Sequence, residues 1–447
     1  MSSSLAFLIC VSGIVGLFFL DRDKSVGTSK ALWLPIVWLG IVGSRPVSVW
    51  LGISTAAADP NRMMDGSPFD GLLFEILLAL GLLVLLCRRS RTRTFLRGGW
   101  PILLYFSYCL LSVMWSDFPE VSFKRWIKSI GDIVMVLIVI TDAEPKEAFK
   151  RLISRLGFIL LPASVLLIKY FGDLGRGYDP DGMPMNTGVT TNKNTLGVIT
   201  LVIALGTLWH FLMLLRAKGL PSRGRHLLAQ GTLLAFGVVV LCLAHSATSG
   251  ACFVLGGGLM LATGLDMVRR RPAGIHALVV AIFLIGGLTW FLGDEAVQAL
   301  GRQPDLTGRT EIWQAVIPLV PNSVIGAGFE SFWLGPRLNR VWSQLSQYMH
   351  VNEAHNGYLE VYLNLGWIGV WLIALILVKG YRNVVATFRH NPVVGSLLLG
   401  YLLAGVLYGI TEAGFRLLNP IWIFLLLTVL VAGSTCRGVG GLKSVGV

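Results

Sequence analysis

The sequence predicts an all-α polytopic integral membrane protein with about 12–13 transmembrane helices. Of its 447 residues, 54% are hydrophobic and only 14% are charged, whereas soluble domains are about 25% charged. The mean hydropathy is +0.70. Apolar stretches recur about every thirty to forty residues between Leu5 and Ala432, each of roughly membrane-spanning length. We therefore expect a single integral membrane domain over residues 1–447.

The predicted helices follow one another with short polar connections. The first, over residues 5–20, has no basic residue ahead of it and ends in Asp21-Arg22-Asp23-Lys24, so we interpret it as a retained helix and not as a cleaved signal peptide. The predicted helices begin near Leu5, Ala31, Gly71, Trp100, Ile127, Leu152, Leu196, Leu227, Gly250, Ile275, Gly357, Val394 and Leu418.

Basic clusters in alternate loops predict the orientation of these helices. Arginine and lysine gather at residues 88–97, 216–225 and 379–389, among other loops, and the positive-inside rule places such loops in the cytoplasm. The opposite face then holds residues 115–125, residues 412–419 and one long polar loop, residues 294–356. This count places the N-terminus outside and the C-terminus inside. If the weak apolar run at residues 31–43 is not a full span, the N-terminus lies inside as well, which is the conventional arrangement.

The net charge and the cysteines exclude other classes of protein. The formal net charge is +13, but the basic residues lie in short loops between helices, so we expect no nucleic-acid partner. Five of the six cysteines fall within or at the ends of apolar runs, where a thiol behaves as a small hydrophobic group. Neither a disulfide framework nor a metal or redox site is indicated.

Several cations break the topological pattern, because they fall on the predicted outer face. They include Lys124, Arg125, Lys193, Arg309 and Arg416. The guanidinium group of arginine engages phosphate oxygens bidentately, and this contact strengthens beside the low dielectric of a membrane. A lipid-linked pyrophosphate would account for these cations. Any single one of them can instead pair with a lipid headgroup or a loop carboxylate.

Four short motifs occur in a fixed order on this outer face. They are Trp115-Ser116-Asp117-Phe118-Pro119 followed by Ser122-Phe123-Lys124-Arg125; Thr191-Asn192-Lys193-Asn194-Thr195-Leu196-Gly197; Gly308-Arg309-Thr310-Glu311-Ile312-Trp313; and His355-Asn356 followed by Gly366-Trp367-Ile368-Gly369. Together they resemble the O-antigen ligase/polymerase (Wzy/WaaL-like) superfamily, and they are most similar to exopolysaccharide repeat-unit polymerases of the ExoQ type. The resemblance covers roughly residues 100–430.

The resemblance implies a GT-C-like membrane glycosyltransferase of the bacterial inner membrane, with its active site facing the periplasm and with no metal or other cofactor. It would polymerise undecaprenyl-pyrophosphate-linked oligosaccharide repeat units into exopolysaccharide or O-antigen. Its partners would be this lipid-linked substrate, the lipid bilayer, a chain-length regulator and a flippase.

The same resemblance assigns roles to residues of this chain. Arg309 matches the family's pyrophosphate-binding arginine, and His355 matches the histidine that activates the acceptor hydroxyl. Lys124, Arg125 and Lys193, with Asn194, match substrate-binding positions more loosely. In one place the chain departs from the pattern, because it reads His245-Ser246 where many relatives carry an arginine in a Ser-Arg motif.

The chemistry of glycosyl transfer independently favours a histidine. Arginines can neutralise the pyrophosphate as it leaves the anomeric carbon, but the attacking hydroxyl still needs a base. A neutral imidazole with a pKa of about 6.5 is suited to that role, so we expect His355 to be the base, with Glu353 or Glu311 fixing its tautomer or holding the acceptor. Asn194 and Asn356 would orient these groups. A capping or interfacial role for His355, with His245 as the rival base, stays open.

Two other functions share part of this pattern. A ligase that transfers the glycan to the lipid A core uses the same kind of donor and differs in its acceptor. A transporter or flippase for the lipid-linked oligosaccharide would carry charges at mid-membrane on broken helices and show internal repeats. Glu75 is the candidate mid-membrane acid for that alternative. A transporter should tolerate His355→Ala, whereas the enzyme should lose its product.

Overall fold

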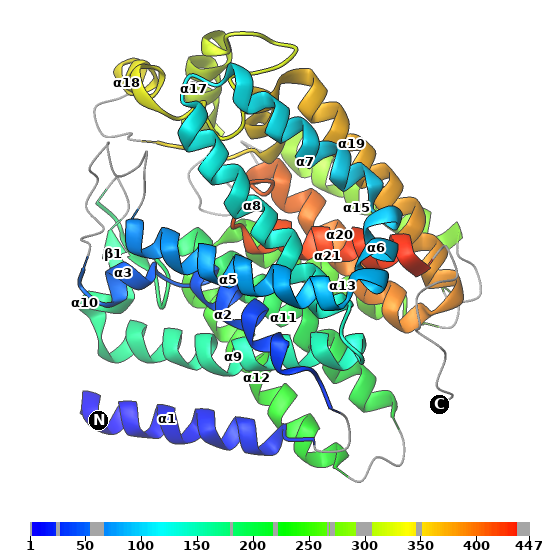
Figure 1. Ribbon diagram of the computed structural model, residues 1–447. Helices are drawn as coiled ribbons and strands as arrows, with labels where there is room; N and C mark the ends of the chain where they lie inside the picture. The colour runs from blue at the N-terminus through cyan, green and yellow to red at the C-terminus, as the bar shows by residue number, and fades with distance from the viewer. Residues whose placement is uncertain are drawn as a thin grey trace.

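The predicted all-α class is confirmed by the computed structural model (Figure 1), which describes residues 2–23, 27–53, 67–178, 182–217, 222–265, 268, 273–291, 306–345 and 351–435. Within these residues the secondary structure is helical, apart from one short antiparallel pair of strands. Strand β1 (Arg176–Tyr178) pairs with β2 (Pro184–Asn186), with Gly177 opposite Met185.

The helices follow the order that the sequence predicts, and each predicted start lies inside a helix or, for Leu418, just before one. The α-helices are α1 (Ser3–Leu20), α2 (Trp33–Val42), α3 (Val47–Trp50), α5 (Pro68–Cys87), α6 (Arg89–Gly98), α7 (Trp100–Ser112), α8 (Pro119–Ile140), α9 (Pro145–Tyr170), α10 (Gly172–Gly175), α11 (Lys193–Arg216), α12 (Arg223–Ala244), α13 (Ala247–Ala262), α15 (Ala273–Phe291), α17 (Leu306–Val316), α18 (Gly335–Gln344), α19 (Gly357–His390), α20 (Pro392–Thr411) and α21 (Pro420–Thr435). The 3-10 helices are η1 (Lys30–Leu32), η2 (Val113–Trp115) and η3 (Ile317–Leu319).

The described residues account for part of the expected number of spans. Among the described residues, 7 helices are long and apolar enough to cross a membrane, or up to 8 if the bent pair α6 and α7 forms one span. They are α1, α5, α9, α11, α12, α19 and α20. The runs predicted near Ala31, Gly250 and Leu418 form apolar helices of only 10–17 residues, which is shorter than the ~20 residues that cross a bilayer upright. Hydropathy reveals the apolar runs, but it does not reveal how early each helix ends.

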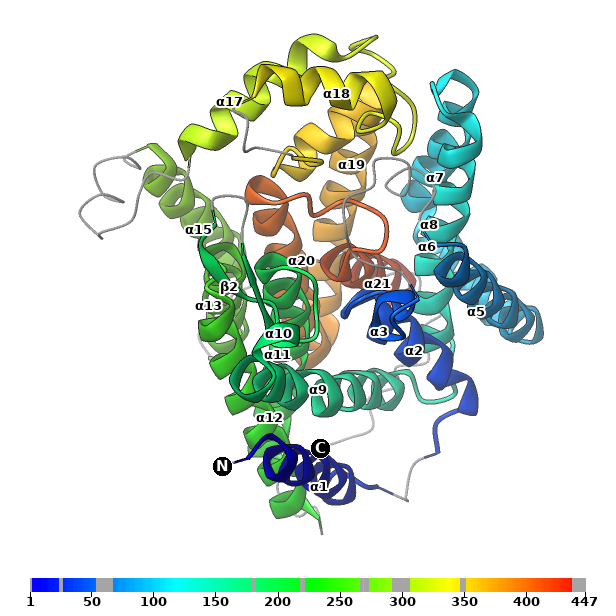
Figure 2. The same cartoon turned by 90° about the vertical axis from the view of Figure 1, so that its left-hand side faces the viewer.

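Helix α11 lies at the centre of the bundle (Figure 2), and its packing explains its composition. Apolar side chains lie around its whole circumference, and 72% of its most apolar 18-residue stretch is buried inside the protein. Its neighbours are α9, α12, α13, α20 and α21. A helix with no polar face is stable only where other helices or lipid surround it. Asn192 begins the helix, because its side-chain oxygen accepts a hydrogen bond from the backbone N–H of Thr195 at 2.7 Å.

Helices α1 and α5 lie at the periphery and expose apolar side chains. Phe19 on α1 is 64% exposed and Leu86 on α5 is 68% exposed. Such continuous apolar surface is unfavourable in water and favourable against lipid chains. These faces therefore fit the acyl chains of a bilayer.

The described residues of the long polar loop form a small cap at one end of the bundle, above α19 (Figures 1 and 2). Its described residues include α17, η3 and α18, while residues 294–305 and 346–350 lie outside the described part of the chain. The cap has its own buried cluster, which includes Ile312, Phe332, Trp333 and Val341. This cluster gives the loop a fixed shape.

The first motif attaches the cap to the bundle. The indole N–H of Trp115 donates to the carbonyl of Ile325 at 3.3 Å, and the hydroxyl of Ser112 accepts from the backbone N–H of Phe329 at 3.0 Å. Gly328 has φ +93° and packs against Ser116 so closely that a Cβ atom would lie 2.7 Å from the Ser116 side chain. The aromatic and serine residues of this motif thus have a structural role.

The last motif attaches the cap from the other side. Gly366 interrupts α19 with φ 62° and ψ −164°, a conformation that favours glycine. A Cβ atom there would lie 2.3 Å from the backbone of Val324. The break lets Trp367 N–H donate to the carbonyl of Ser323 at 2.9 Å. The start of α19, which follows His355, is thereby fixed to the cap.

Candidate active site

Residues 353–356 form a rigid turn that joins the cap to α19. Ala354 is fully buried; its carbonyl accepts from the indole N–H of Trp313 at 2.8 Å, and its N–H donates to a Glu360 carboxylate oxygen at 2.5 Å. Asn356 caps α19 by accepting from Leu359 N–H at 3.0 Å. His355, between Ala354 and Asn356, has φ 47°, which is uncommon for a residue other than glycine. These contacts fix the direction of the imidazole.

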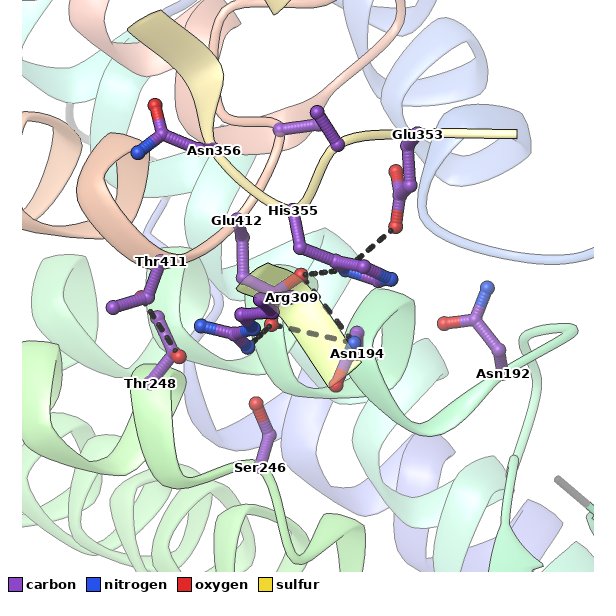
Figure 3. A network of polar contacts seen from close by, with 12 residues as sticks. Asn192, Asn194, Ser246, Thr248, Arg309, Glu353, His355, Asn356, Thr411 and Glu412 are labelled. Atoms are coloured by element: carbon purple, nitrogen blue, oxygen red, sulfur yellow. Dashed lines mark hydrogen bonds and ion pairs between the residues drawn. The ribbon is translucent and has the colours of Figure 1, made fainter. Parts of the chain in front are cut away.

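The turn places His355 against Glu412, which follows α20 and contacts three residues of the site (Figure 3). His355 Nδ1 lies 3.1 Å from Glu412 Oε2 and 3.2 Å from Glu353 Oε1. Glu412 Oε1 also lies 3.4 Å from the guanidinium Nη2 of Arg309. The side-chain amide of Asn194 donates to Glu412 at 3.4 Å. One nearly buried carboxylate thus connects α11, α17, α20 and the His355 turn.

Two opposing effects act on the His355 imidazole. Burial lowers its pKa, but the hydrogen bond to Glu412 and the negative charges of Glu353 and Glu412 outweigh burial, so the pKa lies above its usual 6.5. The bond to Glu412 also favours the tautomer that carries its proton on Nδ1. That tautomer leaves Nε2 as the proton acceptor.

A cavity of about 190 Å³ adjoins this cluster. Its lining includes Asn192 and Asn194 at the start of α11, Glu353, and Glu412 with Arg416 from the segment that precedes α21. The start of α11 presents backbone N–H groups and the positive end of the helix dipole, both of which attract anions. Acidic, basic and amide groups therefore meet beside one cavity.

Arg416, which also lines the cavity, connects the carboxylates on that side of the site. Its guanidinium Nη2 lies 3.6 Å from Glu330 Oε2, and Nη1 lies 3.5 Å from Glu353 Oε2. Nη1 also donates to the carbonyl of Asn352 at 3.4 Å. Burial lowers the pKa of the Arg416 guanidinium, but the negative charges of Glu330, Glu360 and Glu353 raise it by more. The pKa therefore lies above its usual value, and the side chain stays charged. Arg416 thereby holds Glu353 in its position beside His355.

The structure brings together half of the residues predicted for the site. His355, Glu353, Arg309 and Asn194 share the cluster around Glu412, and Lys193 immediately precedes Asn194 at the start of α11. Asn356 adjoins the cluster but has a structural role: it caps α19 and donates to the carbonyl of Ile410 at 3.1 Å.

The two predicted cations of the first motif lie elsewhere. Lys124 is about half-exposed and pairs with Glu120 at 3.0 Å, one turn earlier on α8. Arg125 donates to the backbone carbonyl of Glu330 in the cap. Neither is among the residues that line the cavity.

Glu412 is the residue that sequence reasoning missed. Within residues 412–419, which are predicted to lie on the outer face, only Arg416 is predicted from the sequence as a ligand. The available signal was an acidic residue directly after a span and four residues before that arginine. The pairing with Arg309, Asn194 and His355 joins residues far apart in the chain, so spacing alone could not reveal it.

Two further possibilities concern a metal ion and the rival histidine. Glu353, His355 and Glu412 each offer a ligand atom, and these atoms lie within 4.8 Å of one another. Carboxylate and imidazole groups suit a divalent cation, although the Arg309 contact to Glu412 adds a positive charge beside such an ion. His245 is exposed, follows α12 with φ 50° and precedes the Ser246 cap of α13. It is not among the residues that line the cavity.

Comparisons with known proteins agree with the motifs. Residues 231–374 match the family model Wzy_C, described as O-antigen ligase. The chain is 27% identical over 290 residues to the exopolysaccharide production protein ExoQ of Rhizobium meliloti (strain 1021). That match covers 61% of this chain and 62% of the relative, which is less than two thirds of the relative's length. The predicted resemblance to the O-antigen ligase/polymerase superfamily is confirmed.

Proposed function

We propose that this protein is a membrane glycosyltransferase that polymerises undecaprenyl-pyrophosphate-linked oligosaccharide repeat units into exopolysaccharide or O-antigen. The match to Wzy_C and ExoQ supports a ligase- or polymerase-type membrane enzyme. The observation that carries the proposal is Glu412, which lines a polar cavity and contacts both His355 and Arg309. The site would face the periplasm of a bacterial inner membrane, because the basic loops predict the opposite face to be cytoplasmic.

In this proposal His355 is the catalytic base. Its Nδ1–H donates to Glu412, so Nε2 accepts the proton of the attacking sugar hydroxyl. The hydroxyl oxygen forms the new bond to the anomeric carbon of the donor as the bond from that carbon to the pyrophosphate oxygen breaks. Undecaprenyl pyrophosphate leaves with the electron pair, and the proton stays on the imidazole until solvent removes it.

Arg309 and the start of α11 would stabilise the leaving group. The guanidinium of Arg309 already holds one anionic group, the Glu412 carboxylate, at 3.4 Å. A pyrophosphate in the cavity offers the same kind of oxygen with more negative charge, and fixed cations stabilise the charge that develops on it. Lys193, Asn194 and the backbone N–H groups of α11 would contact the same anion. This chemistry uses no metal ion.

The alternatives differ in acceptor or in class. A ligase that transfers the glycan to the lipid A core would use the same base and the same arginine. A transporter is less well supported, because Glu75, the acid that would favour it, lies exposed on the peripheral helix α5 and is not among the cavity's lining residues. A chain-length regulator and a flippase are the partners that polymerisation would require.

The test uses a deletion strain complemented with wild type or with His355→Ala, in which the size of surface polysaccharide and the lipid-linked intermediates are measured together. A polymerase predicts that His355→Ala loses long polymer and accumulates single repeats on lipid while its membrane level is unchanged. Long polymer that forms on lipid but does not reach lipid A would instead indicate the ligase. Full complementation by His355→Ala would refute the catalytic role.

A further inference from the structure

A buried carboxylate outside the cavity fixes one wall of the site. Asp132 lies on α8, has no exposed surface, and is not among the lining residues. A carboxylate in such surroundings is unfavourable unless hydrogen bonds compensate for the lost water, and within a membrane protein it often marks a functional position. From this geometry we infer that Asp132 is a positioning residue for the active site: it holds residues 412–419 against the cavity. The inference rests on the function proposed above.

Both oxygens of Asp132 accept a hydrogen bond. Oδ2 accepts from the backbone N–H of Leu418 at 2.9 Å, and Oδ1 accepts from the indole N–H of Trp38 at 2.9 Å. The two donors come from segments far apart in the chain, α2 and the connection before α21. Asp132 therefore joins α2, α8 and that connection at one point.

The connection needs such support because its backbone is strained. Leu418 has φ 55°, and a bulky residue in the left-handed region costs conformational energy. The hydrogen bond from Leu418 to a buried carboxylate stabilises that conformation. Asn419 adds a local contact, because its side-chain amide donates to the carbonyl of Ala413 at 3.2 Å.

Trp38 fixes the carboxylate in turn. The indole is fully buried and packs edge-on against Phe74, with 4.7 Å between the ring centroids. Gly131, next to Asp132, leaves room for the ring: a Cβ atom there would lie 2.1 Å from it. Because the indole cannot move aside, the Asp132 carboxylate keeps one orientation.

The fixed connection carries two groups of the site. Glu412 at its start contacts His355 and Arg309, and Arg416 within it contacts Glu353, which also lies beside His355. Leu418 and Asn419 themselves line the cavity. Loss of the Asp132 bond should therefore loosen the carboxylates around His355 and change its pKa, although Asp132 does not contact the substrate.

The test combines two measurements on the full-length protein in nanodiscs. Hydrogen–deuterium exchange is followed in the peptide that contains Leu418, and the pH dependence of kcat and KM is measured with lipid-linked oligosaccharide extracted from the host strain. Asp132→Asn leaves one acceptor oxygen for two donors, so exchange at Leu418 should accelerate by roughly ten-fold or more. Its kcat should fall by about ten-fold, with a smaller change in KM, and its acid limb should move toward lower pH as His355 loses its carboxylate contacts.

Two variants accompany Asp132→Asn. Trp38→Phe removes only the donor that orients the carboxylate, so its effects should have the same sign and be smaller. It carries the test alone if Asp132→Asn does not accumulate in the membrane. Thr387→Val is the matched control, because Thr387 is equally buried but its hydroxyl donates to Asn383 within its own helix. The control should behave as wild type in both measurements.

The inference would be overturned if exchange at Leu418 were unchanged in Asp132→Asn. If only Trp38→Phe accumulates in the membrane, unchanged exchange in that variant would overturn it. Faster exchange with a wild-type pH profile would also overturn it, since Asp132 would then support the fold alone. These outcomes are separate from a failure of the proposed function. That failure would appear as full activity of His355→Ala, whatever the exchange at Leu418.

Discussion

Arg125 and Arg309 come from two motifs that are predicted to lie on the same outer face, yet they lie in different surroundings. Arg125 donates to the backbone carbonyl of Glu330 and helps to attach the cap. Arg309 pairs with the carboxylate of Glu412, which also contacts His355 beside a cavity. A carboxylate that adjoins a cavity can release an arginine to an anionic ligand, whereas a buried carbonyl cannot leave its partner without disrupting the fold. The partner of each arginine, more than its motif, indicates its role.

The largest loss of activity is expected for substitution of Arg309. In the proposed mechanism, Arg309→Ala removes a fixed cation from the place where the leaving pyrophosphate would gain charge, so the turnover of lipid-linked repeat units should fall by roughly 10²–10³-fold. Arg309→Lys should recover part of the loss, because it restores the charge without the bidentate fork. Initial rates of polymer formation by proteoliposomes measure both. A loss of less than about three-fold in Arg309→Ala would contradict a role in catalysis.

The next largest effect is expected for Glu412→Gln, at roughly 10–100-fold in kcat. Glu412 and Glu353 hold the pKa of His355 above 6.5, so the wild-type base is lost to protonation as the pH falls through that raised value. Removal of one negative charge lowers this pKa, so the acid limb of kcat/KM should move to lower pH while the maximum rate falls. A pH–rate profile of both proteins tests the sign. A shift toward higher pH would exclude the assigned partnership.

At Arg125 the expected change is in stability. Arg125→Ala removes the contact to Glu330, and by that route it disturbs the neighbour of Arg416. We expect the apparent unfolding temperature to fall by several degrees, in line with a loss of roughly 1–3 kcal/mol, and the activity of the folded fraction to change by less than about five-fold. Thermal unfolding monitored by tryptophan fluorescence, with rates normalised to folded protein, separates the two effects. A loss as large as that of Arg309→Ala without unfolding would show that Arg125 contacts the substrate.

The smallest effects are expected at Lys124 and on metal removal. Lys124 pairs with Glu120 on an exposed surface, and such pairs contribute little to stability, so Lys124→Ala should keep its rate within about two-fold of wild type.

Incubation with EDTA should also leave the rate unchanged, because arginines and a helix terminus supply the positive charge in the proposed mechanism. Loss of activity in EDTA that Mg²⁺ or Mn²⁺ restores would assign Glu353, His355 and Glu412 to a metal ion.

The sequence predicted the helical class and four of the residues that lie together around Glu412, because both leave local signals. Each start predicted from an apolar run lies inside a helix or just before one, although α3, α6 and α10 had no predicted start. A histidine beside a polar loop was also conspicuous in so apolar a chain. Within the described residues, 7 or 8 helices are long enough to span a membrane, against the 12–13 predicted for the whole chain, because hydropathy cannot tell an 18-residue helix from a 10-residue one that ends at a glycine or a cap. Glu412 and Asp132 were missed because their roles depend on contacts across long chain separations, such as that from Asp132 to Leu418.

The most direct test of the account is the reaction of purified protein in proteoliposomes with lipid-linked repeat units, comparing wild type with His355→Ala. Extended lipid-linked glycan and released undecaprenyl pyrophosphate are quantified together. The account predicts one undecaprenyl pyrophosphate per linkage for wild type and a rate at least about 10²-fold lower for His355→Ala, with binding of the lipid-linked substrate retained. A His355→Ala protein that extends the glycan within about two-fold of the wild-type rate would contradict the central claim.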